Sequence, residues 1–212
     1  MRNGTSSKLS APIQYDGYNF EEQLKDAMSH FFDIFLSKEI KPLYNGKDIF
    51  FDMSKQSGVF TLTYPERFLH IVSMDDEEKF NMYPCVNDPS YEYCDNRCTG
   101  SSQINNFIVL NRWECPYRLS RIHWVREIID LANKGDSNIT EWEVVEANSR
   151  GKYNKRLLRY CCGIDDYLII FRVHTNHYQF ITAYPIVKKS KKDECDKAYS
   201  NYVQKLKRLG IE

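Results

Sequence analysis

The segment HYQFITAYPI, residues 177 to 186, carries polar side chains inside an apolar run that is typical of a β-strand. Thr182 and Tyr184 place hydroxyl groups two residues apart, and His177 begins the run. Because side chains alternate across a strand, the two hydroxyls share one face and can hold the same anion. The alternative is that Thr and Tyr are present only as good strand formers.

Histidines and arginines that could act beside an anion occur elsewhere in the chain. Imidazole exchanges protons near neutral pH, and the planar guanidinium of arginine can hold an anion through two hydrogen bonds. The residues of these types that we single out are His70, Arg118, Arg121, His123 and Arg159.

The charge of the chain is balanced, with 29 basic and 29 acidic side chains, so a global field that attracts polyanions is absent. Basic residues nevertheless gather in two segments, 112 to 126 and 150 to 159. Two local clusters in a neutral protein favour a focused anion site over a general nucleic-acid coat. The alternative is that they form two solvated helix faces.

The cysteines allow one metal-site hypothesis. The chain has no run of 18 apolar residues and no apolar stretch near its start, so we expect a cytoplasmic protein without a membrane partner. Disulfides are not expected in that reducing compartment. Cys85, Cys94, Cys98 and Cys115 can supply four thiolates to a zinc ion. Their loose spacing leaves free thiols in a loop as the alternative.

The elements that must position these residues follow from apolar periodicity. Helices are expected at residues 19–40, 64–72, 121–133 and about 193–208. Asn19 is the expected N-cap of the first helix. Short strands at 48–53 and 57–63 are expected to pair through a polar turn.

The segments DYLIIFRVHT and HYQFITAYPIV predict a C-terminal β-hairpin around the polar turn between them. Their nearly continuous apolar character indicates that both faces are covered and that they lie centrally in a sheet. We expect residue 173 to pair with residue 178. The pairs that follow from this register are Ile169 with Thr182 and Tyr167 with Tyr184.

The order of elements predicts an α+β fold with helices packed on one side of a sheet. We expect a single domain over 19–187, preceded by a loose arm over 1–18. An irregular insertion is expected at about 73–105, because acidic residues, Asn, Pro, Gly and Ser dominate there. A basic linker and the last helix follow over 188–212.

Three stretches, YPERFLHI, CPYRLSRIHWVREII and YLIIFRVHTNHYQFITAYPI, occur in this order. Together they resemble the prophage-associated nucleases of the barnase–EndoU–colicin–RelE superfamily. The blocks that carry the resemblance are P-E-R-F-x-H-I at Pro65 to Ile71, R-x-x-R-I-x-W at Arg118 to Trp124, and F-x-T-A-Y at Phe180 to Tyr184. The resemblance extends over about residues 15 to 187, and only these short blocks carry it.

The resemblance implies N-terminal helices packed on a curved antiparallel sheet and an endoribonuclease that uses no metal or other cofactor. In such a reaction the ribose 2′-OH attacks the adjacent phosphate. The protein would be a toxin or a phage or mobile-element effector, with RNA as substrate and an inhibitor or antitoxin as partner. The expected catalytic residues are His70, Arg121, His123, Arg159, Thr182 and Tyr184. The expected substrate-binding residues are Arg118, Tyr167 and His177.

Two other functions fit the same sequence. The first is a non-catalytic interaction module, such as an inhibitor or an antitoxin-like protein, which the many aromatic side chains and the balanced charge favour. The second is a zinc-stabilised binding protein organised by the cysteines between residues 85 and 115.

Overall fold

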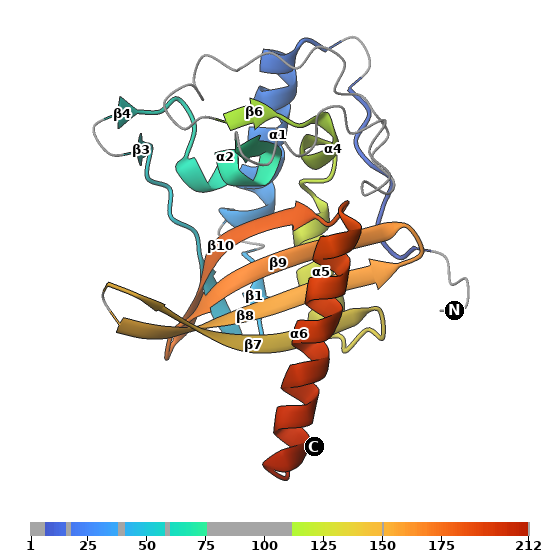
Figure 1. Ribbon diagram of the computed structural model, residues 1–212. Helices are drawn as coiled ribbons and strands as arrows, with labels where there is room; N and C mark the ends of the chain where they lie inside the picture. The colour runs from blue at the N-terminus through green and yellow to red at the C-terminus, as the bar shows by residue number, and fades with distance from the viewer. Residues whose placement is uncertain are drawn as a thin grey trace.

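The fold is α+β, with helices packed against a curled six-stranded sheet (Figure 1). A computed structural model describes residues 7–15, 18–37, 41–57, 60–75, 112–149 and 151–211. In sheet order the strands are β1 (Leu43–Tyr44), β2 (Lys47–Phe50), β10 (His177–Pro185), β9 (Asp165–Val173), β8 (Gly151–Cys162) and β7 (Ile139–Asn148). Neighbouring strands are antiparallel except β10 and β2, which are parallel, so the sheet is mixed rather than wholly antiparallel.

The remaining described elements form two small two-stranded sheets and several helices. One sheet pairs β3 (Gln56–Ser57) with β4 (Phe60–Thr61), and the other pairs β5 (Ser73–Asp75) with β6 (Arg112–Glu114). The described helices are α1 (Phe20–Phe35), α2 (Glu66–Val72), α4 (Pro116–Leu119), α5 (Trp124–Asn133) and α6 (Lys189–Arg208). No helix in the described part of the chain has both the length and the apolar character that crossing a bilayer requires.

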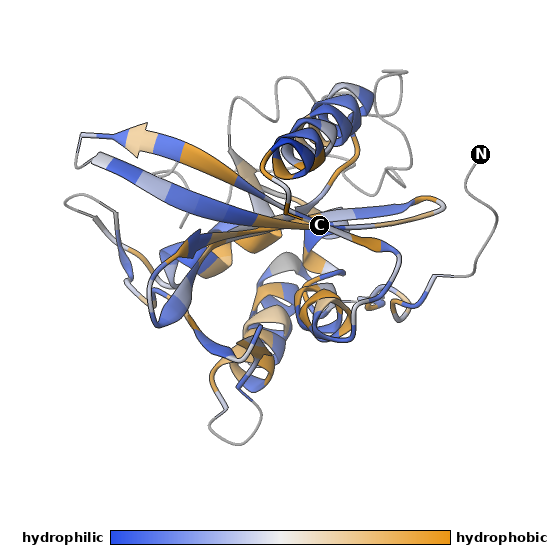
Figure 2. Ribbon diagram, turned by 90° about the horizontal axis from the view of Figure 1, so that it is seen from below, coloured by the Kyte–Doolittle hydropathy of each residue, from blue (hydrophilic) through white to orange (hydrophobic). Residues whose placement is uncertain are grey.

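The two faces of the sheet are covered by different helices. On the face that we call inner, α1, α2 and α5 bury side chains such as Phe31 and Ile128 against Tyr160 and Phe171. On the other face, which we call outer, α6 packs Cys195 against Trp142. Figure 2 shows helices on both sides of the sheet. The expectation that all helices lie on one side was therefore wrong, because the start of α6 has an apolar stripe that covers the outer face.

The first helix and the helix after Pro65 confirm two sequence expectations. Asn19 caps α1: its side chain accepts from the Glu22 amide at 3.0 Å, and the Glu22 carboxylate accepts from the Asn19 amide at 2.8 Å. This reciprocal pair satisfies two backbone donors at the helix start. His70 lies near the end of α2, as expected.

The strand pair expected from 48–53 and 57–63 does not form. Instead β2 lies between β1 and β10, and β3 and β4 make a hairpin of their own. The turn between β1 and β2 contains Asn45 and Gly46, which have φ angles of 49° and 73°. An Asn-Gly pair in this conformation is a strong short-range hairpin signal, and it outweighs the polar turn expected between residues 53 and 57.

The C-terminal hairpin is central in the sheet, as expected, and Val173 pairs with Tyr178. A β-bulge between Phe180 and Thr182 then shifts the register by one residue. The resulting pairs are Thr182 with Ile170, Ala183 with Ile169, Tyr184 with Leu168 and Pro185 with Tyr167. The pairs predicted for Thr182 and Tyr184 were therefore wrong, and both side chains lie on the outer face.

The described part of the expected N-terminal arm is held against the domain. Ile13 donates its amide to the Ser120 carbonyl at 2.8 Å, and the Trp124 indole donates to the Ser10 carbonyl at 2.8 Å. Leu9 is buried in the inner core. Of the insertion expected at about 73–105, residues 73–75 form β5 and the rest lies outside the described residues.

Candidate functional site

Two buried arginines converge on one backbone carbonyl near the end of β10. The Ser73 carbonyl accepts from Arg112 Nη2 at 2.9 Å and from Arg118 Nη1 at 2.6 Å. Arg112 Nε also donates to the Ser73 hydroxyl at 2.7 Å. Both arginines are about 95 % buried, with 5 % and 6 % of their surface exposed. Two guanidinium groups are thus fixed side by side by one backbone oxygen.

His70 connects the arginines to a carboxylate. Its Nδ1 lies 3.4 Å from Arg112 Nη1, and its Nε2 lies 3.6 Å from Glu66 Oε1, one helical turn away. Arginine can only donate, so Nδ1 faces it as an acceptor and the proton of the neutral ring is on Nε2, toward Glu66. The side chains of His70 and Glu66 are each 31 % exposed, so the cluster is open to solvent on this side.

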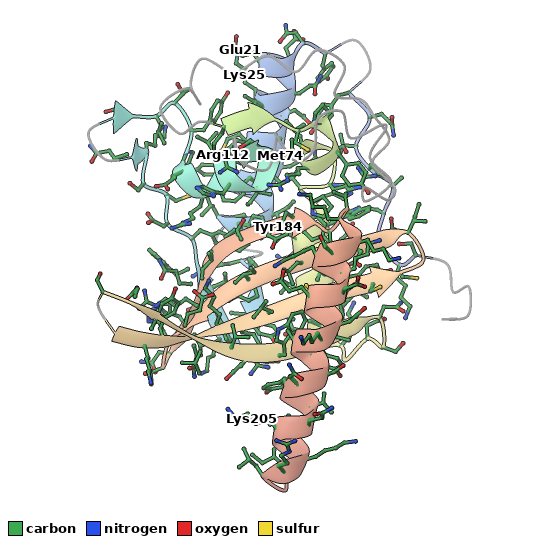
Figure 3. The ribbon with its side chains drawn as sticks, in the orientation of Figure 1. Glu21, Lys25, Met74, Arg112, Tyr184 and Lys205 are labelled. Atoms are coloured by element: carbon green, nitrogen blue, oxygen red, sulfur yellow. The ribbon has the colours of Figure 1, made fainter. Side chains whose placement is uncertain are left out.

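Tyr184 completes the group from the sheet. The Arg118 guanidinium carbon lies 5.4 Å from the centre of the Tyr184 ring. Figure 3 shows Arg112 and Met74 close together above the sheet, with Tyr184 at the edge nearest to them. Lys191 of α6 is near enough to Tyr184 for the two groups to interact electrostatically. We call Glu66, His70, Arg112, Arg118 and Tyr184 the arginine cluster.

A further cation lies beside the bulge in β10. Arg67 of α2 donates from Nη1 to the Ile181 carbonyl at 3.3 Å. Because β2 pairs only with residues 177–179 of β10, the edge of β10 beyond them is open to α2. This contact joins α2 to β10, and Arg67 lies about one helical turn before His70 on α2.

Arg121 and Tyr167 lie on the other side of Arg118. The Arg121 guanidinium lies 3.5 Å from the centre of the Tyr117 ring, and its Nη1 donates to the Tyr117 carbonyl at 3.0 Å. Arg121 Nε and the Tyr167 hydroxyl are buried without a hydrogen-bond partner. Burial raises the pKa of Tyr167, against the opposing effect of the Arg118 and Arg121 charges. Tyr167 belongs to the inner face, whereas Tyr184 and Thr182 belong to the outer face.

His123 precedes α5 and is packed rather than grouped with the arginine cluster. Its Nδ1 is buried without a hydrogen-bond partner, and its ring lies 6.4 Å from that of Trp124. Burial lowers the pKa of His123, although the Glu127 charge acts in the opposite direction. The neutral form is therefore favoured near neutral pH.

Arg159 is held in an ion-pair network on the outer face. It contacts Asp166 through two hydrogen bonds and Asp196 of α6 through a third. Burial works against its charge, but the two carboxylates outweigh this effect and raise the pKa of Arg159. These contacts use the guanidinium to join α6 to the sheet.

His177 lies at the start of β10, at the opposite end of the strand from Tyr184. Its ring stacks on that of His174, with centroids 4.5 Å apart and planes within 8°. Of the zinc candidates, Cys115 is buried and the other three lie outside the described residues. Where side chains are described, no three His, Cys, Asp or Glu residues gather as metal ligands would.

The structure thus brings His70, Arg118 and Tyr184 together from three separate sequence blocks. Arg112, Ser73 and Glu66 were missed by the sequence reasoning. Glu66 lies four residues before His70 on a helix, which is a spacing that the sequence shows. The role of Ser73 depends on a backbone carbonyl, which no residue pattern reveals. No protein-family profile, curated protein or solved structure matched this chain when each was compared with it.

Proposed function

We propose that this protein is an endoribonuclease that cleaves RNA without a metal ion, with the arginine cluster as its active site. The observation that supports this most is the contact of His70 with both Arg112 and Glu66. A carboxylate that fixes an imidazole, whose other nitrogen faces a phosphate-binding cation, is the arrangement that general base catalysis at a phosphodiester needs. The sequence resemblance to prophage-associated nucleases favours the same chemistry.

Each residue has a role in the proposed reaction. The Glu66 carboxylate lies 3.6 Å from His70 Nε2, where its charge favours a proton on Nε2 and so keeps the lone pair on Nδ1. With phosphate on Arg112, Nδ1 takes the proton of the ribose 2′-OH, and the 2′-oxygen attacks phosphorus. The bond from phosphorus to the 5′-oxygen breaks, and Tyr184 protonates that oxygen. The products are a 2′,3′-cyclic phosphate and a 5′-OH end, and solvent returns the proton from His70 to Tyr184.

The arginines supply the electrostatic part of catalysis. The phosphorane carries one more negative charge than the substrate phosphate, and fixed guanidinium groups stabilise it without reorganising. Arg112 and Arg118 are already held by the Ser73 carbonyl, so their positions are set before RNA arrives. The exposed side of the cluster, at His70 and Glu66, is where the ribose would enter.

Cleavage of a defined substrate tests the proposal. A labelled RNA oligonucleotide and its DNA counterpart would be incubated with purified protein in EDTA, and the ends analysed for 2′,3′-cyclic phosphate. We expect cleavage of RNA alone. His70→Asn should lower the rate about 100-fold or more, and Arg118→Met and Tyr184→Phe about 100-fold each.

Matched surface variants make the result specific. His30→Asn changes a histidine on α1 and Arg126→Met changes an arginine paired with Asp130, and both should keep full activity. Each variant would first be shown to fold by circular dichroism. Intact RNA at micromolar wild-type protein, or a folded His70→Asn variant that cleaves as fast as wild type, would refute the proposal.

A further inference from the structure

The outer face of the sheet has a second polar and aromatic surface, at the end that α6 does not cover. Helix α6 packs over Trp142, Leu168 and Ile186, and Figure 1 shows it crossing only one end of the sheet. At the other end Phe50 is 52 % exposed. Among the described helices, none lies over this end.

Side chains of four strands form one row across this surface. Gln179 of β10 pairs with Phe50 of β2 on one side and with Arg172 of β9 on the other. Arg172 in turn pairs with Lys155 of β8. Residues paired side by side point to the same face, and Tyr178, next to Gln179, is buried on the inner face. The row Phe50–Gln179–Arg172–Lys155 therefore lies on the outer face.

Two more aromatic rings flank the row. The His177 ring meets the edge of Phe50, with centroids 6.2 Å apart. The Arg172 guanidinium carbon lies 4.5 Å from the centre of the Tyr153 ring, and the Lys155 ammonium nitrogen lies 6.0 Å from it. We call these six residues, Phe50, Tyr153, Lys155, Arg172, His177 and Gln179, the sheet platform.

The chemistry of the platform fits an unpaired nucleic-acid strand. Aromatic rings stack on exposed bases, cations lie against the phosphates, and an amide such as Gln179 can hydrogen-bond to base edges. The nearby carboxylates are paired, Glu146 with Lys155 at 2.6 Å and Asp48 with Lys41 at 3.1 Å. Among the described residues Arg172 forms no ion pair with a carboxylate, so it supplies the net positive charge of the platform, and its guanidinium lies over the Tyr153 ring.

The bulge in β10 joins the platform to the arginine cluster. Without the bulge, the regular alternation of side chains would place Thr182 and Tyr184 on the inner face, away from Gln179. With it, His177, Gln179, Thr182 and Tyr184 all lie on the outer face. The strand from His177 to Tyr184 spans about 20 Å, and Arg67 contributes a cation at the bulge between them.

We propose that the sheet platform binds single-stranded RNA and that the strand runs along the outer side of β10, placing a phosphate at the arginine cluster. This inference rests on the proposed function, because it names the form of RNA and the path by which it reaches that site. A duplex is disfavoured, since its stacked bases cannot lie on Phe50, His177 or Tyr153.

Binding would be measured with a fluorescein-labelled, 2′-O-methylated 12-nucleotide RNA, which lacks the attacking hydroxyl and cannot be cleaved. We expect Phe50→Ala to weaken binding about tenfold and Phe50→Trp to restore it. The matched control is Phe32→Ala, since Phe32 on α1 is 53 % exposed, about as much as Phe50. Arg172→Gln should lower the slope of log affinity against log salt by about 0.7.

The outcomes separate this inference from the proposed function. Tight binding by a wild-type protein that cleaves no RNA would refute the nuclease and leave the platform standing. Equal affinity of wild type and Phe50→Ala, equal affinity for a matched duplex, or no RNA binding at all would refute the platform. In an active protein, Phe50→Ala should raise KM for the 12-nucleotide RNA, and the control Phe32→Ala should leave KM unchanged.

Discussion

Arg159 and Asp166 form a two-point ion pair between β8 and β9. Arg159 Nε donates to Asp166 Oδ1 at 2.8 Å and Nη2 donates to Oδ2 at 2.6 Å. The two side chains are 5 % and 2 % exposed, and the remaining Nη1 donates to Asp196 of α6 at 2.8 Å. The charge of this guanidinium is matched by two carboxylates, so we expect the pair to stabilise the fold rather than to bind a phosphate.

The two carboxylates that hold Arg159 should differ strongly in their effect on stability. Asp166→Ala leaves a buried, half-paired charge and should lower the free energy of unfolding by about 3–5 kcal/mol. Asp196 is 63 % exposed, so Asp196→Ala should cost less than about 1 kcal/mol. Urea unfolding followed by circular dichroism measures both. Equal losses in the two variants would show that Asp166 does not anchor Arg159 more strongly than Asp196 does.

His123 should make the protein less stable in mild acid. Burial lowers its pKa in the folded state below the ordinary value of 6.5, so the unfolded chain binds a proton at higher pH than the folded one. Stability is therefore unaffected by this group well above pH 6.5, and it falls as the pH drops below 6.5 toward the folded pKa. His123→Asn removes this dependence.

The measurement is the free energy of unfolding of wild type and His123→Asn from pH 8 to pH 5. The difference between the two should be constant at the alkaline end and should shift in favour of the variant below pH 6.5. Carboxyls such as Asp136, whose pKa is lowered by the hydrogen bond from Lys8, titrate in both proteins and cancel in the difference. Parallel curves across the whole range would contradict the buried, neutral imidazole.

Local patterns predicted most of the elements but little of their arrangement. The caps and apolar spacing of α1, the Pro65 start of α2 and the C-terminal hairpin depend on neighbouring residues, so the sequence shows them directly. The parallel pairing of β2 with β10 joins segments that are about 130 residues apart. No local pattern encodes such a pairing, because it results from packing of the whole sheet.

The candidate site could be predicted only in part, because its residues also come together through packing of distant segments. His70, Arg118 and Tyr184 could be singled out by residue type, but their convergence depends on the pairing of β5 with β6, which places Ser73 beside Arg112. Arg121 was grouped with Arg118 because both lie close to His123 in the sequence. The chain instead turns between α4 and α5, and Arg121 packs on Tyr117.

Deleting Ile181 should leave Thr182 and Tyr184 on the outer face. Ile181 is the extra residue of the bulge, so without it Phe180 still pairs with Phe171 and Thr182 still pairs with Ile170. We therefore expect the deletion to lower the free energy of unfolding by about 1 kcal/mol, as Ile181→Ala should. Urea unfolding compares the two variants. A loss of more than about 3 kcal/mol in the deletion variant alone would show that Ile181 is not the extra residue.

The two ends of α6 should contribute unequally to stability. In the part up to Val203, Cys195 is buried, and the Tyr199 ring meets the edge of Trp142 with centroids 6.2 Å apart. Figure 1 shows the end of α6 extending past β7, the edge strand of the sheet. Ending the chain after Val203 removes mainly exposed residues and should change the free energy of unfolding by less than about 0.5 kcal/mol, the usual range for surface changes.

Tyr199→Ala is the matched change in the part of α6 before the truncation. It removes partly buried aromatic surface next to Trp142 and should cost about 2 kcal/mol, less than a fully buried aromatic ring would. Indole fluorescence should also shift, because Trp142 is 1 % exposed and would gain contact with water. If the truncation destabilised the protein as much as Tyr199→Ala, the end of α6 would have to pack against the domain, contrary to the exposure of residues 204–211.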